Sequence, residues 1–337
     1  KILDLKVIVL LTLIFTSSLS ISAQDWKWAE GFGNPVGSSI INGMSKMTNN
    51  KIAAIGFFQS DSIQVGNFNL KGSSTSPIVC IFNQNGEYEN AISFGGNGDD
   101  RPTAIATDQN DNIYVAGNFK SLVFIAGNDT LFNKGESDGF VVKLDKNLNI
   151  LWAMPIATAS QDILSDIKVD KVGNIYFTGV SVKYLNGNTT EGVYLIKIKP
   201  DKTIERINQG NSNEYAGYAE VKSIHIDNDN NCYWLGYGYE LKFQNGFSTS
   251  NSTTDEFGFF IKYSPNGTIL SNQTTANMLC SSFDQQYFYV SQLYYDSVDY
   301  NNYGVKIIKY DQSLNEIWKK KIKKGSVGGG NTPIDHT

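Results

Sequence analysis

The chain has 337 residues, of which 18% are charged, and it carries a formal net charge of -5 with a pI near 5.2. A nucleic-acid or anionic-membrane partner requires clustered Lys and Arg, so this composition argues against both. Gly (31), Phe (19) and Tyr (18) are abundant, which favours many short strands joined by tight turns over long helices.

Residues 1–23 have the pattern of a secretory signal peptide. Lys1 and Lys6 precede the apolar stretch 7–15, and small residues follow it up to Ala23. The competing interpretation, a membrane anchor, requires an apolar stretch long enough to span a bilayer, and this one is shorter. We therefore expect a mature protein that begins near Gln24, has no membrane span, and is secreted or held at the cell surface.

One sequence pattern recurs five times along the mature chain, and such a repeat decides the fold class before any single motif does. Its clearest part is a hairpin arm that ends in Gly, as in residues 112–117 (NIYVAG) and 174–179 (NIYFTG). A short segment that usually ends in Asp precedes each arm, for example residues 103–108, and the turn between the two is rich in Asn, Asp and Gly. Two further apolar segments follow each arm, for example residues 139–145 and 150–152.

Four antiparallel strands per repeat, with an apolar period of two, predict an all-β fold, a β-propeller built of four-stranded blades. The predicted blades span residues 37–94, 99–157, 161–209, 217–273 and 275–322, and residues 323–337 resemble the start of a sixth. Trp26 and Trp28 match the outer-strand position of Trp152, and Lys1 is not an initiator Met. We therefore expect a monomeric propeller that is an incomplete part of a longer chain.

Within this pattern the sequence resembles a known family. Residues 94–99 (FGGNGD), 104–108, 112–117, 138–145 and Trp152 look like the repeat of bacterial secreted seven-bladed β-propellers, known as the SBBP repeat. The resemblance covers most of the mature chain and fades in the fourth and fifth copies. It implies an exported protein, often one with a carboxy-terminal sorting domain, for which this sequence offers no candidate.

Two loops place oxygen ligands at alternate positions, as calcium-binding loops do. Asp227, Asp229 and Asn231 form the better candidate, and residues 108–112 form a second one. Neither loop is followed by the bidentate Glu of a calcium loop, and a hairpin turn requires the same residue types. Calcium is the one cofactor that the sequence suggests, with turn formation as the alternative.

Asp99, Asp100 and Asp162 precede predicted inner strands, so they are candidates for a ligand site at one mouth of the propeller channel. Such carboxylates could hold a cation or perform acid–base chemistry, or they could cap the strands as solvated loop ends. The recurring Lys143, Lys197, Lys262 and Lys309 indicate a repeated polar position on an outward face.

The sequence contains no nucleophile elbow, phosphate loop, paired-Cys motif or zinc signature, so we assign no catalytic residue. The first hypothesis is therefore a non-catalytic binding or scaffold module for a glycan, peptide or protein. An extracellular polysaccharide hydrolase or lyase that uses acids such as Asp99 and Asp162 is the alternative, and a structural spacer of a large adhesin is a third. Fold alone cannot decide among them.

Overall fold

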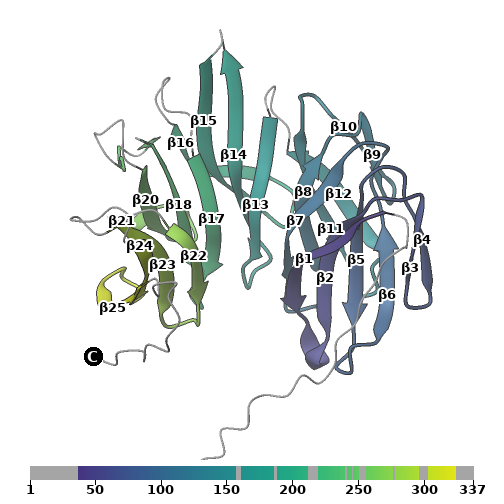
Figure 1. Ribbon diagram of the computed structural model, residues 1–337, viewed down its shortest axis with the longest axis horizontal. Coiled ribbons are helices and arrows are strands. Elements are labelled where there is room, and N and C mark those ends of the chain that lie inside the picture. Colours follow the sequence, from purple (N-terminus) through teal and green to yellow (C-terminus); the bar gives the residue numbers. More distant parts are fainter. Residues whose placement is uncertain are drawn as a thin grey trace, which may run out of the picture. The chain divides into compact units, whose positions relative to one another are not determined.

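The structure is a computed structural model that describes residues 37–156, 161–185, 188–211, 219–239, 241–244, 246–249, 256–275, 278–295 and 303–323 (Figure 1). The predicted signal peptide, Trp26, Trp28 and the predicted sixth blade after Lys323 lie outside these residues. No helix among the described residues is long and apolar enough to cross a membrane.

Five antiparallel sheets follow one another along the chain, each with four main strands (Figure 1). Sheet 1 comprises β1 (Ser39–Lys46), β2 (Ile52–Phe58), β5 (Ser76–Phe82) and β6 (Tyr88–Ser93). Sheet 2 comprises β7 (Asp100–Thr107), β8 (Ile113–Phe119), β11 (Asp138–Leu144) and β12 (Ile150–Ile156). Sheet 3 comprises β13 (Gln161–Val169), β14 (Ile175–Leu185), β15 (Asn188–Ile198) and β16 (Ile204–Asn211).

Sheet 4 comprises β17 (Ala219–Ile226), β18 (Cys232–Tyr239), β20 (Glu256–Tyr263) and β21 (Ile269–Thr275). Sheet 5 comprises β22 (Met278–Phe283), β23 (Phe288–Tyr295), β24 (Tyr303–Tyr310) and β25 (Glu316–Lys323). The first strands of the sheets, β1, β7, β13, β17 and β22, contact one another in succession. Each sheet is thus a blade whose first strand is the inner one, and the predicted β-propeller is confirmed.

Insertions between the second and third strands add short strands that the repeat pattern did not predict. Sheet 1 carries the hairpin β3 (Ser62–Val65) and β4 (Phe68–Lys71), and sheet 2 carries β9 (Val123–Ala126) and β10 (Asp129–Phe132). In sheet 4 the insertion contains β19 (Lys242–Phe243), which pairs with β16 of the preceding sheet. The insertions therefore add structure near the outer strands of the blades.

The turn from the inner strand into the hairpin arm is built around the Asp that recurs at this point. Asp170 accepts hydrogen bonds from the backbone N–H groups of Val172 (3.1 Å) and Asn174 (2.8 Å), and from the side-chain amide of Asn174 (2.7 Å). The hydroxyl of Tyr176 donates to the same carboxylate at 3.4 Å. The spacing Asp-x-x-x-Asn-x-Tyr is therefore typical of a turn whose hydrogen bonds all lie within the motif. Asp108 and Asp227 form turns of the same kind.

The recurring lysines lie over these tyrosines, so their prediction as an outward polar row needs correction. The Nζ atoms of Lys143 and Lys262 each lie 4.9 Å from the ring centroid of Tyr114 and Tyr233, respectively. Lys143 and Lys262 are half-buried. Their repeated position follows from a cation–π contact within each sheet.

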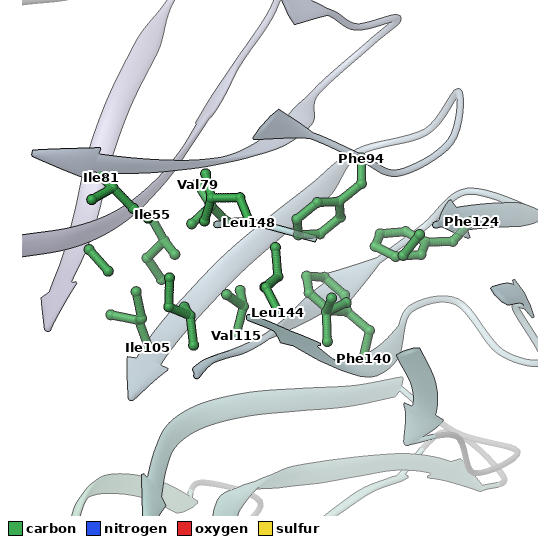
Figure 2. Packing of buried hydrophobic residues seen from close by; sticks show 14 of the residues in the cluster. Ile55, Val79, Ile81, Phe94, Ile105, Val115, Phe124, Phe140, Leu144 and Leu148 are labelled. Carbon is green, nitrogen blue, oxygen red and sulfur yellow. The ribbon is translucent and has the colours of Figure 1, made fainter. Parts of the chain in front are cut away.

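Apolar clusters fill the spaces between neighbouring sheets. Figure 2 shows the cluster between sheets 1 and 2, where Ile55, Val79 and Ile81 face Ile105 and Val115. Corresponding clusters lie between sheets 2 and 3, 3 and 4, and 4 and 5. The facing surfaces of neighbouring blades thus bury their apolar side chains against each other, which is the main source of stability in this fold.

Candidate functional site

Asp100, one of the predicted ligand-binding acids, is buried and its carboxylate is fully used within the protein. Oδ2 accepts hydrogen bonds from the N–H of Gly96 and the hydroxyl of Ser121, both at 2.7 Å. Oδ1 accepts from the N–H groups of Lys120 and Ser121, both at 3.1 Å. Asp100 therefore holds two loops together from the first position of β7, which is a buried role and not that of a solvated loop end.

Asp99 and Asp162 have different surroundings. Asp99 is exposed and pairs with the guanidinium of Arg101 at 2.6 Å. Burial alone would raise the pKa of Asp99, but hydrogen bonds from Arg101 and Thr75 outweigh it and hold this pKa below its usual value. Asp162 is buried near the start of β13, where its carbonyl oxygen accepts a hydrogen bond from the side chain of Asn118 at 2.6 Å.

Among the described residues, no three or more His, Cys, Asp or Glu side chains are grouped to hold a metal ion. Asp99, Asp100 and Asp162 thus form no such group. Ligand binding by these three acids stays a prediction.

The candidate calcium loop is one of the repeated turns. Oδ1 of Asp227 accepts from the N–H groups of Asp229 (2.9 Å) and Asn231 (2.8 Å). Oδ2 accepts from the side-chain amide of Asn231 (2.8 Å) and the hydroxyl of Tyr233 (3.0 Å), and Nζ of Lys262 lies 3.7 Å away. Both oxygens of Asp227 thus face hydrogen-bond donors and a cation. Calcium binding at this loop stays a prediction. The hydrogen bonds of the turn involve all three predicted ligands, Asp227, Asp229 and Asn231.

The described residues outline an open groove of about 740 Å³ between sheets 3 and 4. We name it the β16–β21 groove. Three segments form it: β16, the insertion around β19, and the end of β20 with its turn into β21. Its lining includes the side chains of Ile207, Asn208, Gln244, Phe247, Thr268 and Asn272.

The local sequence explains how the insertion reaches β16. Gly210 pairs with Phe243 of β19, and a Cβ atom at Gly210 would lie 2.6 Å from the Phe243 ring, so a larger residue would force the strands apart. The turn after β19 closes with a hydrogen bond from the N–H of Gly246 to the carbonyl of Phe243 at 3.0 Å, and Gly246 has φ +83°. Phe247 follows this turn and lies half-buried against the core between sheets 3 and 4.

The floor of the groove is fixed, whereas its rim is exposed. Asn208 is buried, and its side-chain amide donates to the hydroxyl of Tyr263 at 2.6 Å. Burial raises the pKa of Tyr263 well above its usual value despite this hydrogen bond, so the phenol stays neutral. Gln244, Thr268 and Asn272 are exposed at the rim. The groove thus combines apolar surface with neutral hydrogen-bonding groups, and none of the described residues that line it is charged.

Sequence reasoning missed this site because its residues come from three segments of two blades. One signal was present, because the stretch between the arm and the third strand of the fourth repeat, residues 237–258, is longer than that of the third repeat, residues 180–192. Insertions in repeat proteins map to loops on the surface and frequently carry binding residues. Their path back onto the preceding blade depends on tertiary packing, which the repeat pattern does not encode.

Comparisons with known proteins agree with the fold. Residues 93–118 match the family described as "Beta-propeller repeat" (SBBP). A 195-residue region is 27% identical to an uncharacterized WD repeat-containing protein of Acanthamoeba polyphaga mimivirus, covering 45% of this chain and 14% of that protein.

Solved structures that align with this chain include a cobalt-substituted Synechocystis ACO (TM-score 0.39, 11% identity, 84% of this chain and 60% of that chain). An ACO/RPE65 chimera aligns with a TM-score of 0.45, 11% identity, and 87% of this chain against 63% of the other. Because these TM-scores and identities are low, the fold is assigned from the four-stranded sheets and the matched repeat. The chain is a β-propeller protein that carries an SBBP β-propeller repeat at residues 93–118.

Proposed function

We propose that this protein is an exported, non-catalytic binding module and that its β16–β21 groove binds a neutral glycan. The observation that carries the proposal is the lining of the groove. It presents side-chain amides, a hydroxyl and an aromatic ring around a volume of about 740 Å³, without a charged side chain. A ligand with many hydroxyl groups and no net charge matches this surface.

Individual chemical groups of a sugar match individual groups of the groove. A sugar hydroxyl both donates and accepts hydrogen bonds, and each amide of Gln244 and Asn272 offers two donors and one acceptor centre. The C–H face of a pyranose ring is apolar and packs well against an aromatic face, which Phe247 supplies. A charged peptide or polyanion would find no opposite charge in the groove, and burial of an unpaired charge is costly.

The surroundings of the acids support a binding role over hydrolysis. A glycosidase needs two carboxyl groups on either side of the scissile bond. The described part of the β16–β21 groove has no carboxylate in its lining, and the oxygens of Asp100 are occupied by the bonds that hold its two loops. A hydrolase or lyase remains the alternative, and it would release reducing ends or unsaturated products from a bound polysaccharide.

The export part of the proposal rests on residues 1–23 and is tested separately. Expression of the full chain with this segment, followed by fractionation and mass spectrometry, should give an extracellular or surface protein whose N-terminus is Gln24. Retention of residues 1–23 in a cytoplasmic protein would contradict it.

The binding part is tested with a glycan array and then by calorimetry on the purified mature chain. Asn272→Ala and Phe247→Ala should each weaken binding of the selected neutral glycan by about 5- to 10-fold, which corresponds to about 1 kcal/mol for one hydrogen bond or one ring contact. Thr274→Ala is the matched control, because Thr274 is exposed on β21 and lies outside the groove lining.

Selection of acidic glycans or of a protein ligand, or equal binding by all three variants, would contradict the assignment of the groove to a neutral glycan. Turnover of the bound glycan would support the hydrolase alternative. Binding to none of the arrayed ligands would favour the spacer.

A further inference from the structure

A second groove lies between sheets 1 and 2. Its volume is about 470 Å³, and it combines the same three structural parts as the β16–β21 groove: the outer strand of one sheet, the insertion of the next sheet, and that sheet's turn into its last strand. Here the parts are β6, the turn between β9 and β10, and the start of β12. We name it the β6–β12 groove.

The hydrogen-bonding register shows that corresponding residues line the two grooves. Ile150 is the first residue of β12 and pairs with Leu144, and Ile269 is the first residue of β21 and pairs with Tyr263. Both isoleucines lie half-buried against the apolar cluster between their two sheets. Each groove therefore has an isoleucine at the same position of the blade.

The turns that form the grooves also correspond. Leu148 and Gly267 occupy the same place before the last strand, and both have positive φ, 63° and 84°. Their N–H groups close equivalent turns, with N–O distances of 3.0 and 2.9 Å. The insertion turns contain Gly127 and Gly246, which also have positive φ, 61° and 83°. The similarity thus extends to the insertions, which the sequence repeat did not include.

The chemistry of the second groove matches that of the first. Its lining, as far as the structure describes the chain, contains no charged side chain, and its polar groups are the side chains of Ser93, Asn128 and Asn149. Ile125 lies at the rim of this groove and is 53% exposed, so most of its side chain is not stabilised by burial in the core. Both grooves therefore offer neutral hydrogen-bonding groups beside apolar surface.

The boundary between sheets 2 and 3 differs at the corresponding position. Lys202 occupies the turn position of Leu148 and Gly267, with φ 68°. Its Nζ lies 5.7 Å from the ring centroid of Trp152 on the outer strand of sheet 2. Because the Lys202 ammonium group lies over the Trp152 ring, the surface at this boundary is charged. The boundaries between sheets 1 and 2 and between sheets 3 and 4 share an uncharged groove surface instead.

We infer that the β6–β12 groove is a second site for the same class of neutral glycan, so that one chain binds two segments of a polysaccharide. This inference rests on the proposed function of the β16–β21 groove. Two sites on one chain convert weak binding of a short oligosaccharide into stronger binding of a long polymer, because the second contact is intramolecular.

The experiment uses the mature chain and four neutral probes in separate titrations: cellohexaose, xylohexaose, laminarihexaose and mannohexaose. Calorimetry on the probe that binds should give two sites per chain. Asn272→Ala weakens one of them, and Ile125→Ala weakens the other, each by about 5- to 10-fold. Leu122→Ala is the matched control for Ile125→Ala, because Leu122 is 79% exposed next to the same hairpin and does not line the groove.

The double variant Asn272→Ala/Ile125→Ala should lose about 25- to 100-fold in affinity for the corresponding polymer, which is the product of the two single losses, whereas each site loses only about 5- to 10-fold for the hexasaccharide. One site per chain, weakened by Asn272→Ala and unaffected by Ile125→Ala, overturns this inference and leaves the proposed function intact. Failure of all four probes to bind overturns both. A melting temperature equal to that of the wild-type chain shows that a variant is folded, so that its loss of binding is not caused by unfolding.

Discussion

The imidazole Nε2 of His225 lies 2.8 Å from the hydroxyl oxygen of Ser281, although 56 residues separate the two in the sequence. The contact joins the inner strands β17 and β22. Ser281 also lies 2.5 Å from the hydroxyl of Ser223, and Asp166 on β13 accepts a hydrogen bond from the N–H of Ile224 at 2.8 Å. Polar bonds thus connect the inner strands of three successive blades.

The first prediction concerns the pH dependence of stability. Burial, together with a smaller contribution from the charge of Lys168, lowers the pKa of His225 to about 4, and the carboxylate of Asp166 partly opposes this shift. Since the pKa is 6.5 in an unfolded chain, protons bind the unfolded state more tightly, and acid favours unfolding. The contribution of His225 is fully present above pH 6.5 and is lost as the pH falls towards 4, by about 1.4 kcal/mol per pH unit.

This prediction is checked by urea unfolding of the wild type and His225→Gln between pH 8 and pH 4. The difference in unfolding free energy between the two proteins should change by about 3 kcal/mol over this range. The other acids and His336 are common to both proteins and cancel in the difference. A difference that is independent of pH would show that His225 is exposed to solvent.

The second prediction separates the two neighbouring acids. Asp100→Asn should lower the unfolding free energy by about 2–3 kcal/mol, because one carboxylate oxygen that accepts two hydrogen bonds becomes an amide that donates. Asp99→Asn should change it by less than about 1 kcal/mol, because an exposed ion pair contributes little. Chemical denaturation of both variants provides the test, and equal effects would contradict the buried role of Asp100.

The third prediction concerns Asp138, whose replacement should raise the stability of the protein, whereas replacement of Asp100 should lower it. Asp138 is buried at the start of β11, where Oδ2 accepts from the N–H of Lys134 at 2.6 Å and Oδ1 has no hydrogen-bond partner among the described residues. Burial raises its pKa, so the folded state favours the protonated acid and loses this contribution as the pH rises. Asp138→Asn should therefore stabilise the protein by about 1 kcal/mol at pH 7. In thermal scans at pH 7, a lower melting temperature for the variant would contradict this.

The fourth prediction distinguishes a turn from a calcium site at Asp227. Because donors already occupy both carboxylate oxygens, addition of calcium or EDTA should leave the melting temperature unchanged. Asp227→Asn should destabilise the protein by about 1–3 kcal/mol, and Asp229→Asn by less than about 0.5 kcal/mol, since Asp229 contributes its backbone N–H to the turn. A rise in melting temperature with calcium that Asp229→Asn abolishes would establish the metal site.

These relationships show where sequence reasoning was sufficient. The blade could be predicted because its information is local: the arm 112–117 is a short apolar run that ends in Gly, its turn carries Asp108 and Asn112, and the third and fourth copies repeat this pair of Asp and Asn. The insertions carried a local signal as well, since Gly127 and Asn128 separate two alternating segments, as in a tight hairpin.

The contacts between blades could not be predicted in this way. His225 meets Ser281, and Asn208 meets Tyr263, only after two blades have packed, and neither pair has a characteristic spacing in the sequence. The surroundings of the acids could not be predicted for the same reason. Asp100 is a plausible ligand residue in a linear sequence, whereas in the fold its oxygens bind Gly96, Lys120 and Ser121.

The most direct test of the central claim is a crystal structure of the mature chain soaked with the neutral hexasaccharide that binds best in solution. The account predicts sugar density in the β16–β21 groove, with a pyranose ring against Phe247 and hydroxyl groups within hydrogen-bond distance of Gln244 or Asn272. Sugar density confined to the acids Asp99 and Asp162, with the groove empty, would contradict it.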